Sequence, residues 1–189
     1  MESTFRGKIY QLKIHLLGAS PMVWRRLLLR DDTSLAHFHG VIQLVMGWEN
    51  FHLHNFDISG KSYGLSYPGA GGWFSDCATT TLLRDLNLRI KDKFKYTYNY
   101  FANWKIQIRV EKILDFKKGQ QYPFCKAGSN AGPFEEVRSM EHFEAIRDLF
   151  CYPENDFFKI LQFHENIYFP WKSNVFKKKV INAWLKKEY

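Results

Sequence analysis

Apolar and polar residues alternate along two stretches near the start of the chain. From Ile9 to Leu17 nearly every second residue is apolar, which predicts a half-buried strand. Residues 22–30 are rich in strand-forming side chains and predict a second strand, reached through a turn at residues 18–21. Asp31-Asp32 ends this strand. The chain is therefore expected to open with a β-hairpin.

A helical period follows the hairpin. Thr33 or Ser34 can cap the amino end of this helix, and Gly47 is placed to end it in left-handed geometry. The apolar positions recur at spacings typical of one helix face and are Leu35, Phe38, Ile42 and Val45.

A short strand and a loop come next. The strand is expected at residues 52–58, where His52, His54, Phe56 and Ile58 would share one face. Residues 65–76 are rich in Gly and Ser and predict a surface loop. A phosphate-binding loop needs a Lys, a preceding strand and a following helix, and this loop has none of them. We therefore do not interpret it as a phosphate-binding loop.

The strongest alternation lies near residues 93–114. Aromatic residues alternate with polar ones up to a turn at 101–103, and apolar residues alternate again from Trp104, so that a long antiparallel hairpin is predicted. Tyr96, Tyr98 and Tyr100 would lie on its buried face. Its polar face would be cationic and would carry Lys93, Lys95, Lys105 and Arg109.

Helical periods dominate after residue 138. Helices are expected from Ser139 to about residue 153, over 156–164 and over 173–187. The apolar stripe of the last would comprise Phe176, Val180, Trp184 and Leu185. Because neither a repeat nor a linker separates two cores, we predict one α+β domain over residues 1–189, sheet-rich over 1–125 and helical over 138–189.

Composition supports a folded domain and excludes several classes of protein. Of 189 residues, 46% are hydrophobic and 17% aromatic, which excludes disorder as the main state. No signal-peptide core and no apolar run near the ~20 residues of a membrane span is present, so we expect a soluble, cytoplasmic protein without membrane contact. Three Cys without a C-x-x-C pair exclude a disulfide framework and a zinc ribbon: Cys77, Cys125 and Cys151.

The net charge of +8 favours a polyanionic partner, either nucleic acid or an acidic protein. Arg25 and Arg26 follow Trp24 on a strand, so one guanidinium would point to each face, and the inward one would stack on a ring or bind a carboxylate such as Asp57. The candidate contacts to nucleic acid or another anion are Arg25, Arg26, Lys93, Lys95, Lys105, Arg109, Lys177, Lys178 and Lys179. Because the hairpin tyrosines should face the other way, base stacking is not favoured.

Three histidines are the candidate metal ligands: His39, His52 and His54. Imidazole is a common ligand of zinc or nickel, but no Cys or carboxylate adjacent in the sequence completes a site. Packing of these rings beside Trp48 and Phe56 is therefore the favoured interpretation. The sequence implies no cofactor and no small-molecule ligand.

Catalytic motifs are absent from the sequence. Neither G-x-S-x-G nor H-E-x-x-H occurs, and no thiol has the context of a catalytic nucleophile. A metal-dependent or hydrolase-like enzyme that combines the three histidines with Glu135 or Glu136 remains the alternative. A module that binds a protein along an exposed sheet edge is a third hypothesis.

Short motifs spread over nearly the whole chain carry a family resemblance. They are Tyr10-Gln-Leu-Lys-Ile14, Pro21-Met-Val-Trp-Arg-Arg26, Leu35 to His39, Val41-Ile-Gln43, Met46-Gly-Trp48, His52-Leu-His-Asn-Phe56, Tyr98-Asn-Tyr100, Trp104, Glu111, Tyr122-Pro-Phe-Cys125, Gly128, Pro133, Phe176, Asn182 and Leu185. In their order and spacing the chain resembles the plasmid pRiA4b open-reading-frame-three-like family, which also includes passenger proteins of insertion elements.

The resemblance implies an α+β domain with a mixed or antiparallel sheet that opens with a β-hairpin and a helix, similar to a ubiquitin-type grasp. It implies a mobile-element origin rather than a biochemical activity. It also implies structural roles for the matching positions Trp24, Gly47, Trp48, Phe56, Trp104 and Asn182.

The departures from the family pattern bear on chemistry. Members read aromatic-Gly-Asp-x-Trp where this chain reads Tyr100-Phe-Ala-Asn-Trp104, and Ile106 replaces a frequent His. Gly132, Val137, Arg138 and Ser139 stand where members often hold a second Cys, an acidic pair and Gly-Gly. Any metal or acid–base role of those groups would be lost here. The family resemblance, the net charge of +8 and the absence of a complete catalytic set lead to the main hypothesis. It is a non-enzymatic accessory protein of mobile-element type that acts as a binding or interaction module and contacts nucleic acid non-specifically through its basic surface.

Overall fold

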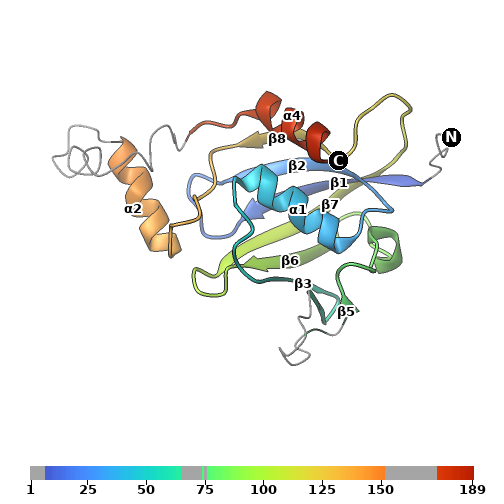
Figure 1. Cartoon of the computed structure of the whole chain (residues 1–189), viewed down its shortest axis with the longest axis horizontal. Coiled ribbons are helices and arrows are strands. Elements are labelled where there is room, and N and C mark those ends of the chain that lie inside the picture. The colour runs from blue at the N-terminus through green and yellow to red at the C-terminus, as the bar shows by residue number, and fades with distance from the viewer. Residues whose placement is uncertain (1–6, 65–73, 75, 152–173) are drawn as a thin grey trace.

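The computed structural model describes residues 7–64, 74, 76–151 and 174–189. A mixed sheet of eight strands forms its centre, in the order β5-β4-β3-β6-β7-β1-β2-β8 (Figure 1). The strands are β1 (Lys8–Leu16), β2 (Trp24–Arg30), β3 (His54–Ile58), β4 (Lys61–Gly64), β5 (Asp76–Cys77), β6 (Lys93–Tyr98), β7 (Trp104–Asp115) and β8 (Phe124–Ser129). β4 and β5 run parallel, whereas the other neighbours are antiparallel.

The helices lie on one face and at the two ends of this sheet (Figure 1). They are α1 (Leu35–Met46), α2 (Met140–Cys151), α4 (Lys178–Glu188) and the short 3-10 helix η1 (Leu83–Leu86). α1 crosses the front of the sheet in Figure 1, α4 runs beside β8 and contacts α1, and α2 and η1 stand at opposite ends. The predicted α+β class, with its opening hairpin and helix, its long second hairpin and its C-terminal helices, is confirmed. Among the described residues, no helix is long and apolar enough to cross a membrane.

Local sequence signals fix the ends of α1 as expected. The Ser34 hydroxyl accepts a hydrogen bond from the His37 amide at 3.1 Å, which satisfies one of the free N–H groups of the first turn. Gly47 ends the helix with φ of 82°, a left-handed conformation that a residue without Cβ adopts at little cost. Ser139 likewise caps α2 by accepting from the His142 amide.

The aromatic residues of β6 and β7 form the middle of the core. Tyr96, Tyr98 and Trp104 are at most 1% exposed, and they pack with Phe38 of α1 and Phe56 of β3. Burying one such side chain contributes about 1.5–3 kcal/mol. These rings therefore hold α1 against the sheet and stabilise the domain.

An amide attaches the C-terminal helix to the edge of the sheet. Asn182 of α4 accepts from the Cys125 amide through Oδ1 at 2.8 Å and donates from Nδ2 to the Cys125 carbonyl at 2.9 Å. Both main-chain groups of Cys125 that point away from β2 are satisfied in this way. The side chain thus links α4 to β8.

Four details differ from the sequence-based expectations. β3 begins at His54, so His52 does not share a strand face with it, and Tyr100 is 48% exposed because β6 ends at Tyr98. β8 was not expected, because its six residues do not alternate clearly. The buried residues of α4 are Ile181 and Leu185, whereas Val180 and Trp184 face outward. The expected helix at 156–164 lies outside the described residues.

Candidate functional site

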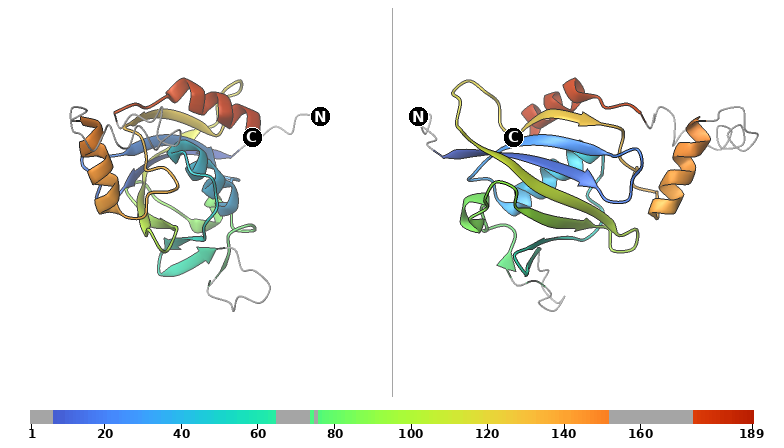
Figure 2. Two further views of the ribbon diagram at one scale, coloured as in Figure 1. Left: turned by 60° about the vertical axis from the view of Figure 1, so that its left-hand side comes forward. Right: turned by 180° about the vertical axis from the view of Figure 1, so that it is seen from behind.

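One face of the sheet carries no helix in the described part of the chain. Seen from behind, β2, β1, β7 and β6 lie uncovered (Figure 2, right). Four cationic side chains stand directly opposite one another across these strands, because Lys93 pairs with Arg109, Arg109 with Lys13, and Lys13 with Arg26. Strands are about 4.8 Å apart, so this row is about 14 Å long.

The row is electrostatically unfavourable as it stands, because like charges directly opposite each other destabilise a sheet. Glu111 compensates Arg26, accepting from its Nε at 2.5 Å and from its Nη2 at 2.8 Å. Within the described residues, no carboxylate forms an ion pair with Lys13, Lys93 or Arg109. An external anion would relieve the repulsion that remains.

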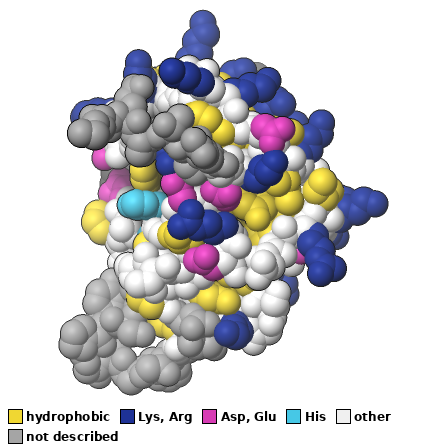
Figure 3. All heavy atoms as spheres, turned by 90° about the vertical axis from the view of Figure 1, so that its right-hand side faces the viewer, with side chains coloured by type: hydrophobic (Ala, Val, Ile, Leu, Met, Phe, Trp, Pro, Cys, Tyr) yellow, Lys and Arg dark blue, Asp and Glu magenta, His cyan; other side chains and the backbone are white. Residues whose placement is uncertain are grey.

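Further cations extend this surface, which we call the cationic sheet face and define as Lys13, Arg26, Lys93, Lys95, Lys105 and Arg109. Lys95 and Lys105 are exposed and lie on one side of the row, two residues along β6 and four residues along β7. Figure 3 has this side of the sheet on its right, where Lys and Arg side chains project. The sequence predicted the four hairpin cations, and the pairing of β1 with β7 adds Lys13.

Two rings lie within the cationic sheet face. The half-buried Trp24 has Lys13 Nζ at 5.2 Å and Arg26 Cζ at 5.3 Å from its ring centroid, so cation–π contacts hold these two charges. His15, paired with Trp24, has a lowered pKa because of burial and of repulsion by Lys13 and Lys93. Because cations already occupy the Trp24 ring, this face offers charge rather than a platform for bases.

The lysines of the last helix form a separate surface. Lys177 precedes α4, and Lys178 and Lys179 are exposed in its first turn. α4 packs against β8 and α1, and α1 covers the opposite face of the sheet (Figures 1 and 2). The structure therefore does not bring these three lysines together with the cationic sheet face.

Arg25 points into the protein and is removed from the candidate nucleic-acid contacts. It is 2% exposed and donates from Nε to the Val45 carbonyl at 2.8 Å and from Nη1 to the Trp24 and Ser129 carbonyls. Its Cζ lies 4.6 Å from the ring centroid of Phe176. The expected inward stacking is thus present, whereas the expected carboxylate partner is replaced by carbonyl groups. Burial lowers the pKa of Arg25 to about 10.

Two of the three candidate metal ligands stack on each other in the core. The rings of His39 and His54 are 3.4 Å apart with an interplanar angle of 4°. Gln43 donates to the Tyr96 hydroxyl, so this hydroxyl donates its own proton to His39 Nδ1 at 2.8 Å. The proton of the His39 ring is then on Nε2, which donates to Asn50 Oδ1 at 2.6 Å. Both nitrogens of His39 are engaged, and burial lowers its pKa.

His54 and His52 do not complete a metal site with His39. The Nε2 of His54 is buried without a hydrogen-bond partner, and lone pairs in two parallel stacked ring planes cannot converge on one ion. His52 is on a loop, with Nε2 3.5 Å from Glu135, whose Oε1 also accepts from the Tyr98 hydroxyl. Among the described residues, no group of three or more His, Cys, Asp or Glu is arranged to hold a metal ion.

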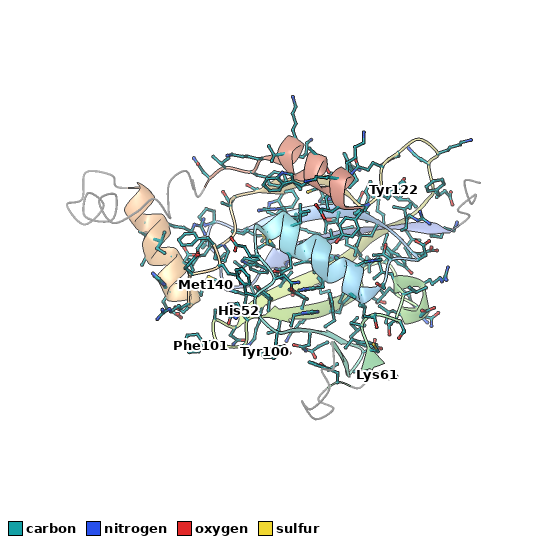
Figure 4. The ribbon with its side chains drawn as sticks, in the orientation of Figure 1. His52, Lys61, Tyr100, Phe101, Tyr122 and Met140 are labelled. Carbon is teal, nitrogen blue, oxygen red and sulfur yellow. The ribbon has the colours of Figure 1, made fainter. Side chains whose placement is uncertain are left out.

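An exposed apolar patch beside His52 was not anticipated. Phe101 is 83% exposed and Phe51 is 71% exposed, and Leu53 and Tyr100 extend the patch. His52, Tyr100 and Phe101 gather at one end of the fold in Figure 4, where the loops after α1 and after β6 meet. The two loops are joined by the Asn99 amide, which donates to the Leu53 carbonyl. Sequence reasoning missed this patch because burial at strand ends depends on neighbouring loops.

Comparison with known proteins gives consistent matches. A model of the family of plasmid pRiA4b ORF-3-like proteins matches residues 8–179. The uncharacterized protein y4hQ of Sinorhizobium fredii (strain NBRC 101917 / NGR234) is 28% identical over 146 residues, which cover 75% of each chain. The crystal structure of MM3350, a protein of unknown function from Methanosarcina mazei Go1, is similar with a TM-score of 0.78 and 26% identity, covering 94% of this chain and 98% of that one.

Proposed function

The chain belongs to the plasmid pRiA4b ORF-3-like family, and from that premise we propose that it is a non-enzymatic accessory protein of mobile elements that binds nucleic acid without base specificity. The cationic sheet face would be the contact surface. Such a role would place the protein in the cytoplasm.

The single observation that carries this proposal is the row Lys93–Arg109–Lys13–Arg26 on a sheet face that no described helix covers. Lys93, Arg109 and Lys13 form no ion pair with a carboxylate among the described residues. A nucleic-acid backbone is an extended row of negative charges, and binding would replace repulsion by attraction while releasing counterions. Because Tyr96 and Tyr98 are buried on the other face, the contact would involve phosphates rather than bases.

The test is a fluorescence-anisotropy titration of labelled duplex and single-stranded DNA at several salt concentrations. If four cations contact phosphates, log K for duplex DNA should fall with log salt at a slope of about −3.6. That slope corresponds to about a 100-fold loss of affinity between 50 and 200 mM salt.

Two matched double variants identify the surface. K93Q/R109Q removes two charges from the cationic sheet face and should reduce the steepness of the slope by about 2. K178Q/K179Q removes the same charge from α4 and should leave the slope unchanged. The proposal is wrong if neither DNA binds at 50 mM salt, if binding is independent of salt, or if the α4 variant alone weakens it.

A further inference from the structure

An open groove lies on the opposite side of the molecule from the cationic sheet face. Its volume is about 540 Å³, and it runs between the end of α1, residues 131–134 and the start of α4. Apolar side chains line most of it, among them Leu44, Met46, Phe134, Val180 and Trp184. Small-molecule sites typically have volumes of about 300–1,000 Å³ and apolar walls with a few polar groups.

Two exposed apolar side chains of α4 mark the rim of this groove. Trp184 is 52% exposed and Val180 is 39% exposed, although a helix packed against a sheet would ordinarily turn such residues inward. Their neighbours Ile181 and Leu185 supply the contacts that fix α4. Trp184 and Val180 are therefore not needed to attach the helix, and they leave apolar surface available to a ligand.

Arg25 lines the wall of the groove, and its buried charge has no carboxylate counter-ion within the described residues. Its hydrogen-bond partners are three carbonyl oxygens, and no carboxylate of the described residues contacts it. Carbonyl dipoles satisfy Nε and Nη1 without neutralising the charge, and a buried uncompensated charge is costly. Nη2 makes no hydrogen bond within the described chain. Arg25 is 2% exposed and lines the groove, so a ligand would reach Nη2 only through the wall of the groove.

We infer that this groove binds an amphiphilic monocarboxylate, with the carboxylate on Arg25 Nη2 and the apolar body against Val180 and Trp184. A single free nitrogen with two N–H donors matches one carboxylate better than a dianionic phosphate. Lys177 at the rim adds a second positive charge near the head group. An apolar body of about ten carbons fits a groove of this size.

Arg25 also stabilises the fold, and the test must separate this effect from an effect on ligand binding. The Val45 carbonyl belongs to the last turn of α1, where a cation stabilises the helix end by about 0.3–2 kcal/mol. Gly128 leaves room for this arrangement, because a Cβ there would lie 2.8 Å from Phe176 and 2.9 Å from Arg25. A variant of Arg25 can therefore lose stability for reasons unrelated to a ligand.

The experiment compares two probes with the same ten-carbon chain by isothermal titration calorimetry: decanoate and decyltrimethylammonium. Decanoate should bind with a Kd below 1 mM, at least tenfold more tightly than the cation, which corresponds to about 1.4 kcal/mol. In ¹H–¹⁵N spectra the amides of Gly47 and Gly132 should shift on titration, since both residues line the groove.

Variants at exposed positions keep the test independent of folding. Trp184→Ala should weaken decanoate binding at least fivefold, whereas Phe101→Ala, at an exposed aromatic outside the groove, should leave it unchanged. R25M, if folded, should remove the preference for the anion. K93Q/R109Q should leave the affinity for decanoate unchanged. The test of the groove is therefore independent of whether the cationic sheet face binds nucleic acid. Equal affinity for the two probes, no effect of W184A, or no binding of decanoate at millimolar concentration would overturn the inference.

Discussion

The buried imidazole of His54 should make the protein sensitive to mild acid. The side chain is 6% exposed, its Nε2 has no partner, and it stacks on His39. Burial, together with repulsion from His39, lowers its pKa from 6.5 to about 3. In the unfolded chain the imidazole regains its ordinary pKa, so below pH 6.5 the unfolded state binds a proton that the folded state does not.

The size of the effect follows from these two pKa values. The contribution of His54 to the free energy of unfolding is fully present above its unfolded pKa of 6.5, and it is lost progressively as the pH falls toward 3. Between pH 7 and pH 4, the loss from this one group is about 3 kcal/mol. For a domain of this size it lowers Tm by about 6–12 °C. His39, whose pKa is also lowered, adds to the loss in the same direction.

The measurement is urea unfolding, followed by circular dichroism at pH 7 and pH 4, for the wild type and His54→Phe. Phenylalanine retains the stack on His39 and removes the titrating group, so the variant should lose about 3 kcal/mol less between the two pH values. H37Q, which removes an exposed imidazole at the start of α1, is the control and should behave as the wild type. If His54→Phe and the wild type lose the same free energy, the assignment of the acid sensitivity to His54 is refuted.

Three further outcomes are expected. Glu111→Gln should raise affinity for DNA about threefold by freeing Arg26 and removing a negative charge from the cationic sheet face, measured by anisotropy against the wild type. Bound DNA should raise the lowered pKa of His15, so affinity should increase as the pH falls from 7.5 to 5.5, and His15→Gln should abolish that increase. Asn182→Ala should lower the free energy of unfolding by about 1–3 kcal/mol, because it leaves the Cys125 main chain unpaired, and unchanged urea midpoints would contradict this.

Local sequence patterns predicted the structure correctly where the environment of a residue depends on its near neighbours in the sequence. The alternation over 93–114 predicted β6 and β7, and Ser34 and Gly47 marked the ends of α1 because caps act within one turn. Alternation also implied that Arg25 and Arg26 face opposite ways. It could not decide which of them is buried, since that depends on α1, β8 and Phe176 packing against one side of β2.

Contacts between distant segments produced what the sequence did not predict. Lys13 joins the row of cations because β1 pairs with β7, whose residues lie about a hundred positions later in the chain. The outward orientation of Trp184 reflects the attachment of α4 through Ile181 and Asn182, a choice that the amphipathic pattern leaves open. Stacking of His39 on His54 likewise required α1 and β3 to be placed side by side.

The bridge between Asn182 and Cys125 also determines how the sheet ends. Open sheet edges recruit strands from other molecules and are a common origin of aggregation. In β8, the last strand on one side, the Asn182 amide occupies the outward N–H and C=O of Cys125 as the backbone of an added strand would. On the other side the last strand among the described residues is β5, which has two residues and offers little to pair with. At Cys125 of β8 and at the short β5, the described sheet therefore offers little for a further strand to pair with, while its face presents a long cationic surface.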